Sequence, residues 1–359
     1  MKRTGTADLP LHGGHAPRWL FSRMVRLSRA LVEVIALEFG VEEFLRRIAD
    51  PHWFQAFGCV LGFDWHSSGL TTTVCGAVKE AIKPIAEDLG LFVCGGKAKA
   101  SRRTPEEIIF WLEKCALPEE LSHLVQKSRL AAKVDNTALQ DGYQLYHHCF
   151  FFTRKGAWAV VQQGLNQKNA YARRYHWLGE KIRQMTEEPH SGIASQKKEA
   201  EVLNLVAKES GKAREVIVSL VKENPAKLLG EIERVTRLVL PRRHGLTEAD
   251  LKPRGLEKVL LNTYENPPRN FENLLEVRGL GPKSLRALAL LSELIYDAPA
   301  SREDPAKYAF AHGGKDGHPY PVNREVYDTS ISYLEELLSK ARLEYSEKMK
   351  AFRRLHQLF

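Results

Sequence analysis

Two apolar runs on either side of residue 155 constrain the fold more than any other part of the chain. Residues 143–153 and 158–163 are rich in aromatic and β-branched side chains, and Arg154-Lys155-Gly156 lies between them. This pattern predicts a β-hairpin in which Gly156 takes the positive φ that the turn needs. The chain is therefore expected to contain an antiparallel sheet.

The hairpin would set polar side chains into that sheet. A three-residue loop pairs His148 with Gln162 and His147 with Gln163, although a slip of one residue in the loop would shift both pairs. Polar groups in an apolar sheet cost stability unless they are partnered. These four side chains therefore indicate either a functional site or a fully satisfied hydrogen-bond network.

Helical patterns surround the hairpin and dominate after residue 190. Apolar residues at helical spacing predict helices at 19–39 and 71–82. The apolar run 57–63, which contains two glycines, is expected to be a buried strand. Pro and Gly within residues 187–192 are typical of a linker. Further helices are expected at 196–209, 211–223, 225–239, 254–263, 270–277, 282–296 and 323–342.

We therefore expect an α+β fold with two domains. Residues 1–190 would form an α+β domain that contains the sheet, and residues 191–359 would form a helical domain. The length of 359 residues suits two domains of ordinary size.

Composition indicates a globular protein with a polyanionic partner. No run approaches the 18 apolar residues that a membrane span needs, and the N-terminus lacks a secretory signal pattern. The odd cysteine count of five and the absence of C-x-x-C argue against a secreted disulfide framework and favour the cytoplasm. The net charge is +9, and residues 234–286 alone hold eleven Lys/Arg against six Asp/Glu. This basic stretch predicts a nucleic-acid partner, or else a solvated helical face.

The segment 271–295 resembles the helix-hairpin-helix DNA-binding motif. Two glycines in Val-Arg-Gly-Leu-Gly lie between two helical patterns, and Pro282-Lys283 follows them. Glycines allow the backbone to approach a phosphate, and the N-terminus of the second helix directs its free N–H groups to the same place. Such contacts hold a DNA backbone without reading bases. The predicted DNA-binding residues are Arg278, Gly279, Gly281, Lys283, Ser284 and Arg286. The alternative is an ordinary pair of helices joined by a glycine turn.

A wider resemblance to the helix-hairpin-helix DNA glycosylases is incomplete. That family carries a catalytic aspartate in a Val-Asp segment after the hairpin, whereas the nearest match here is Val322-Asn323. Asn323 cannot take up a proton or stabilise a cationic sugar as a carboxylate can. A glycosylase is therefore kept as an alternative function.

Polar segments before residue 190 supply candidates for chemistry. They lie at residues 9–15, 62–69, 135–142 and 146–148 together with 162–166. Asp and His side chains with carboxamides suit Mg²⁺, Mn²⁺ or Zn²⁺ acting on phosphate esters, although no established metal signature is present and each histidine alone could be structural. No organic cofactor is indicated. The candidate catalytic residues are Asp64, His66, Asp141, His147, His148 and Gln163, and the candidate metal ligands are Asp64, His66, His12 and His15.

Residues 4–12, 63–69, 140–148 and 308–317 are similar to the domain-of-unknown-function family 763. This resemblance spans nearly the whole chain and implies an intracellular prokaryotic protein. It supplies neither a reaction nor catalytic residues.

The sequence thus predicts a DNA-processing protein of the repair type. The first hypothesis is a metal-dependent nuclease whose helical domain holds the DNA backbone. The alternatives are a glycosylase acting on damaged bases, a DNA-binding module without activity, and an enzyme that modifies RNA. No membrane partner is expected.

Overall fold

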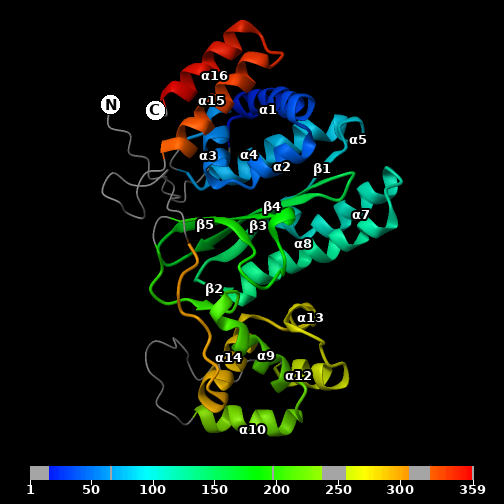
Figure 1. Cartoon of the computed structure of the whole chain (residues 1–359), viewed down its shortest axis with the longest axis vertical. Coiled ribbons are helices and arrows are strands. Elements are labelled where there is room, and N and C mark those ends of the chain that lie inside the picture. The colour runs from blue at the N-terminus through cyan, green and yellow to red at the C-terminus, as the bar shows by residue number, and fades with distance from the viewer. Residues whose placement is uncertain (1–15, 65–66, 196–197, 237–255, 307–323, 358–359) are drawn as a thin grey trace.

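The computed structural model describes residues 16–64, 67–195, 198–236, 256–306 and 324–357. A five-stranded antiparallel sheet lies at mid-height between helices (Figure 1). Its strand order is β1-β3-β4-β5-β6, so β3 to β6 form a meander and β1 pairs with the outer side of β3. The α+β prediction is confirmed. The strands are β1 (Leu91–Lys97), β3 (Gln144–Thr153), β4 (Trp158–Asn166), β5 (Tyr171–Leu178) and β6 (His190–Ala194), and a separate pair is formed by β2 (Leu139–Gln140) and β7 (Leu203–Asn204).

The predicted hairpin is confirmed in its register. β3 pairs with β4, His148 lies opposite Gln162, and His147 lies opposite Gln163. Gly156 has a φ of 85° in the connecting turn. An irregularity between residues 145 and 147 shifts the register at the start of β3. Such a bulge changes the direction of nearby side chains.

Helices cover both faces of the sheet. On one face, Phe44 of α2 meets Phe151 of β3 edge to face with ring centroids 6.3 Å apart. On the other face, Trp111 of α7 packs on Phe92 of β1 at 5.2 Å. The first layer contains α1 (Arg18–Phe39), α2 (Val41–Ile48), α3 (Pro51–Val60) and α4 (Gly69–Ile82), and the second contains α7 (Thr104–Lys114) and α8 (His123–Lys133). Short helices α5 (Ala86–Leu89) and α6 (Lys99–Arg102) flank β1.

A bundle of helices occupies the end of the molecule below α8 (Figure 1). Its members are α9 (Gly211–Leu220), α10 (Pro225–Thr236), α12 (Leu256–Glu265), α13 (Phe271–Glu276) and α14 (Pro282–Tyr296). Each lies within or next to a range predicted from the sequence. Pro225 and Pro282 begin their helices, where the missing N–H costs nothing.

The last two helices, α15 (Arg324–Lys340) and α16 (Tyr345–Gln357), lie at the opposite end of the molecule from this bundle (Figure 1). Lys340 pairs with Glu38 of α1 at 3.1 Å, and Arg354 donates to the Val60 carbonyl at 2.8 Å. Residues 324–357 therefore pack on the N-terminal helices, and β6, which overlaps the expected linker at 187–192, is an edge strand of the sheet.

Two predicted elements are wrong. The apolar run 57–63 is not a strand, because α3 continues through it to Val60. The Asp50 side chain caps this helix by accepting from the amides of His52 and Trp53 at 2.8 and 2.9 Å. Every residue from 53 to 60 is buried, so its apolar pattern could not separate a helix from a strand.

The helix expected at 196–209 is also wrong within the described residues, which are extended or in turns from 198 to 207. The backbone of Asn204 donates to Ser301 at 2.9 Å, and the Arg214 guanidinium donates to the carbonyls of Leu205 and Ala207. These long-range partners take the backbone groups that a helix would use.

None of the described helices is long and apolar enough to cross a bilayer.

Candidate functional site

A cleft of about 810 Å³ opens where β3, α8 and the bundle meet. We call it the α8 cleft. It is bounded by the start of β3, by one side of α8, by the α6–α7 region and by the turn between α13 and α14. Its lining includes Arg102, Ser128, Arg129, Lys133, Tyr146, His147, His148, Leu280 and Gly281. Two predicted catalytic residues and one predicted DNA-binding residue therefore line the same cleft.

Ser128 and His148 form a hydrogen-bonded pair at the cleft. The Ser128 Oγ lies 2.8 Å from Nε2 of His148, and Nδ1 of His148 lies 2.8 Å from Oε1 of Gln162. The Gln162 amide nitrogen faces two acceptors, Asp135 Oδ2 at 2.6 Å and the Ala131 carbonyl at 3.2 Å. Its amide oxygen must therefore point to His148 and accept a hydrogen bond from the Nδ1–H group. Nε2 is then the unprotonated nitrogen, which accepts from the Ser128 hydroxyl.

Asp135 holds Gln162, the residue that binds His148, in place. It lies in the π-helical turn Val134–Ala138 that follows α8, and it is fully buried. Besides Gln162, it accepts from Trp177 Nε1 at 2.9 Å and contacts His190 Nε2 at 2.5 Å. Bonds from three strands thus hold one carboxylate, so the position of Gln162 is strongly determined.

His147 differs from its neighbour because neither ring nitrogen has a hydrogen-bond partner among the described residues. Only 1% of the residue is exposed. Burial lowers the pKa of His147 to about 3 and that of His148 to about 4, so both rings are neutral at physiological pH. A buried polar group without a partner is rare in native proteins and often marks a functional site.

The turn Val277–Gly281 joins α13 and α14 and rests against α8 and β2. Lys133 donates to the Leu280 carbonyl at 2.8 Å. Gln140 donates to the Pro282 carbonyl at 2.9 Å and accepts from Arg286 Nε at 2.8 Å. These bonds fix the predicted DNA-binding segment at the rim of the α8 cleft.

The two glycines of this turn have different roles. Gly279 has a φ of 92°, which strongly favours glycine. Gly281 has a φ of −124°, and a Cβ there would meet no atom of the described residues within 4 Å. Arg278 and Lys283 are exposed, whereas the Ser284 side chain is buried. The space beside the Gly281 backbone is therefore open.

Cations predominate around the cleft. Arg102 and Arg129 are exposed and pair with no carboxylate in the described part of the chain, and Lys133 is bonded to the turn through the Leu280 carbonyl. Burial lowers the pKa of Lys133. Glu106 and Glu276 are the carboxylates among the lining residues. With Arg278 and Lys283 on the turn, the region carries more positive than negative charge.

The remaining candidates are dispersed. Asp64 is exposed beyond the end of α3, and His12, His15 and His66 lie outside the described residues. Gln163 donates to the Ser68 carbonyl at 2.9 Å and to the Tyr146 hydroxyl. Across the described ranges, no three His, Cys, Asp or Glu side chains gather as metal ligands.

Asp141 belongs to a buried ion-pair cluster. Its carboxylate accepts from Arg173 and from the Tyr175 hydroxyl, both at 2.8 Å. Arg173 also pairs with Asp304 at 2.7 Å. Burial raises the pKa of Asp141 against the opposing effect of Arg173. This cluster joins β5 to the segment before residue 306.

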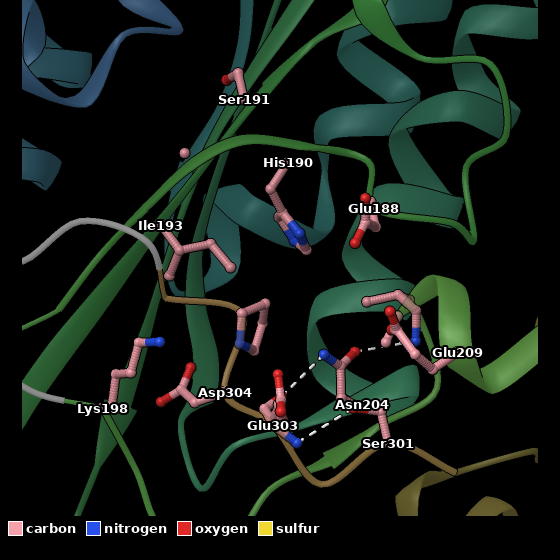
Figure 2. A pocket seen from close by; sticks show the side chains of 14 residues that line it. Glu188, His190, Ser191, Ile193, Lys198, Asn204, Glu209, Ser301, Glu303 and Asp304 are labelled. Carbon is pink, nitrogen blue, oxygen red and sulfur yellow. Dashed lines mark hydrogen bonds between the residues drawn. The ribbon is translucent and has the colours of Figure 1, made fainter.

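A second, smaller cavity of about 210 Å³ lies beside β6, β7 and residues 301–305. Figure 2 shows His190 and Glu188 at one side of it and Lys198 with Asp304 at another. His190 links this cavity to Asp135, and through Gln162 to the α8 cleft.

Sequence reasoning missed Ser128, Asp135 and Gln162 as parts of one unit. Ser128 sits inside a helical pattern with no motif around it. The hairpin register did predict that His148 faces Gln162. Only the packing of α8 on the sheet brings Ser128 to the same ring.

Comparisons with curated proteins and with solved structures find no match. A family model described as "Protein of unknown function (DUF763)" matches residues 5–322. The chain therefore belongs to the DUF763 family.

Proposed function

We propose that the chain binds DNA at the α8 cleft and hydrolyses a phosphodiester bond there. The observation that carries this proposal is the open backbone at Gly281, next to the cationic rim of a cleft that also contains the Ser128–His148 pair. A phosphate needs N–H donors and positive charge, and this rim offers both.

The donors come from the turn and from the first residues of α14. In the described part of the chain, the amides of Gly279 and Gly281 have no hydrogen-bond acceptor. The positive end of the α14 dipole lies at the same place. Arg102, Arg129 and Lys133 extend the positive charge along the cleft. Contacts of this kind favour the backbone of DNA irrespective of base sequence.

The binding of a divalent metal by Asp64, His66, His12 and His15 is a proposal separate from hydrolysis in the α8 cleft. Asp64 stands apart from the α8 cleft, and its three proposed partner ligands lie outside the described residues. The described side chains do not form a metal site, so no step here passes through a metal.

Replacement of Gly281 by valine tests the binding proposal. The Cβ would enter open space, so we expect folding to change by no more than about 1 kcal/mol, which a poorer N-cap residue costs. Loss of one charge-assisted phosphate contact should weaken DNA binding by about ten- to a hundredfold. Binding is measured by fluorescence anisotropy at matched salt, with circular dichroism as the check on folding.

Gly230 of α10 supplies the matched control, because a Cβ at this position also meets nothing within 4 Å. Gly230→Val should leave DNA affinity unchanged. Equal affinities for wild type and Gly281→Val would refute the binding proposal.

Activity is tested on end-labelled single-stranded, double-stranded and abasic DNA, with structured RNA as a competitor. Mg²⁺, Mn²⁺ and EDTA form parallel arms. Cleavage that survives EDTA on ordinary DNA agrees with the chemistry of the α8 cleft. Cleavage confined to modified sites would instead favour the glycosylase reaction over phosphodiester hydrolysis in the α8 cleft.

A further inference from the structure

We propose that Ser128 is the nucleophile of the α8 cleft, with His148 as its general base and Gln162 as the residue that positions the base. This inference rests on the proposed function for its substrate, a phosphodiester. The geometry of the pair itself does not depend on that substrate.

The arrangement meets the structural requirements for an activated hydroxyl. A nucleophile and its base must lie within hydrogen-bond reach, and a third group must orient the base. Ser128 Oγ and His148 Nε2 are 2.8 Å apart, and Gln162 Oε1 holds the opposite nitrogen at 2.8 Å. Both members of the pair line the cleft.

The tautomer is determined by bonds outside the pair. Asp135 and the Ala131 carbonyl bind the amide nitrogen of Gln162, so Gln162 offers only its oxygen to His148. The proton of the imidazole therefore stays on Nδ1. The lone pair on Nε2 points to the Ser128 hydroxyl, which is the orientation that base catalysis needs.

The His148 ring is also in the neutral protonation state that a general base needs. His148 is uncharged at physiological pH because burial lowers its pKa to about 4. It can therefore accept the Ser128 proton without first losing one of its own. The cationic rim would neutralise the charge that gathers on the phosphate oxygens as the reaction proceeds.

The reaction balances in two steps. In the first, the Ser128 proton moves to His148 Nε2, Oγ forms a bond to phosphorus, and the bond from phosphorus to the leaving oxygen breaks as that oxygen takes the proton. In the second, His148 takes a proton from water, the resulting hydroxide oxygen bonds to phosphorus, and Ser128 Oγ leaves with that proton. The net change is the addition of one water across one phosphodiester bond.

The test uses a fluorophosphonate probe, which reacts with activated serines and needs no DNA. The full-length protein is labelled, and the modified residue is located by mass spectrometry. We expect labelling at Ser128 that disappears in Ser128→Ala. In His148→Gln the labelling rate should fall by about 10²- to 10⁴-fold, the usual contribution of a general base.

Ser292→Ala is the matched control. Ser292 is another buried helical serine, but its hydroxyl donates to the Ala298 carbonyl at 2.9 Å rather than to an imidazole. This variant should be labelled at Ser128 at the wild-type rate.

Gln162→Met tests the positioning role. It removes all three hydrogen bonds of the Gln162 amide while keeping a side chain of similar length. In ¹⁵N spectra of histidine-labelled protein, wild-type His148 should be protonated at Nδ1. In the variant this tautomer preference should be lost, together with labelling. A purely structural role for Gln162 would leave the tautomer unchanged.

The outcomes separate this inference from the proposed function. Labelling at Ser128 without DNA cleavage supports the nucleophile and refutes phosphodiester hydrolysis. DNA cleavage at the wild-type rate in Ser128→Ala refutes the nucleophile and retains a nuclease. Absence of labelling at Ser128 in folded wild-type protein overturns the inference directly.

Discussion

Substitution of His147 by leucine should stabilise the protein, and the gain should grow as the pH falls. The imidazole is almost fully buried, and in the part of the chain that the structure describes neither nitrogen has a hydrogen-bond partner. Leucine has a similar volume and no polar atoms. Removing a buried group that lacks a partner should stabilise the fold by about 1–3 kcal/mol at pH 7.5.

The pH-dependent part follows from proton binding. The folded pKa of His147 is about 3, whereas an unfolded histidine titrates near 6.5. Between these values the unfolded chain binds one more proton than the folded chain, so stability decreases as the pH falls. The slope is about 1.4 kcal/mol per pH unit, which amounts to about 3 kcal/mol between pH 6.5 and pH 4. His147→Leu removes this loss.

Urea unfolding, followed by tryptophan fluorescence at pH 7.5, 6, 5 and 4, measures both effects. Thr153→Val is the control, because the Thr153 hydroxyl is also buried without a partner but does not titrate. This control should gain stability at every pH and keep the wild-type slope. Lower stability of His147→Leu at pH 7.5, with an unchanged slope, would mean that the imidazole is bonded in the folded protein and would refute the reasoning.

Three further predictions concern charge and backbone. Replacing both Arg102 and Arg129 by alanine should reduce the slope of log affinity against log salt concentration by about 2, as a salt titration of DNA binding would measure. Arg173→Met should destabilise the fold by about 3–5 kcal/mol, because it leaves two buried carboxylates unpaired. Arg46→Met breaks a more exposed pair and should cost no more than about 1 kcal/mol, and thermal melts compare the two. Gly95→Ala should prevent folding, since its Cβ would lie 2.2 Å from a carbonyl oxygen of β3, and recovery of soluble, cooperatively melting protein would contradict this.

Local patterns explain why the hairpin and most helices were predictable. In β3 and β4, the alternation of side chains and a turn glycine determine the register, so the pairing of His148 with Gln162 could be read from residue order alone. Likewise α1 and α4 follow from apolar spacing, and α14 begins with a first-turn proline. These signals operate within a few residues, and tertiary packing agrees with them.

In α3 and β5, by contrast, the side chains are buried all round, so the sequence pattern does not show how they pack. The apolar run in α3 has no polar face, so its period was ambiguous. In β5, the adjacent residues Arg173 and Arg174 lie between aromatic residues, yet both arginines are fully buried. Arg173 reaches Asp141 and Asp304, and such partners cannot be identified from nearby sequence.

The sequence by itself determined the α+β class, the hairpin register and the helices on either side of the glycine turn. Only the tertiary structure decided which groups meet in the α8 cleft. Ser128 reaches His148 because α8 packs across the sheet, and Gly281 joins the same cleft because Lys133 and Gln140 hold the turn in place. The physical reason is the distance along the sequence over which the interactions act. Secondary structure follows from periodicity and turn chemistry within a few residues. A site built from α8, β3, β4 and α14 requires the packing of side chains that are distant in sequence.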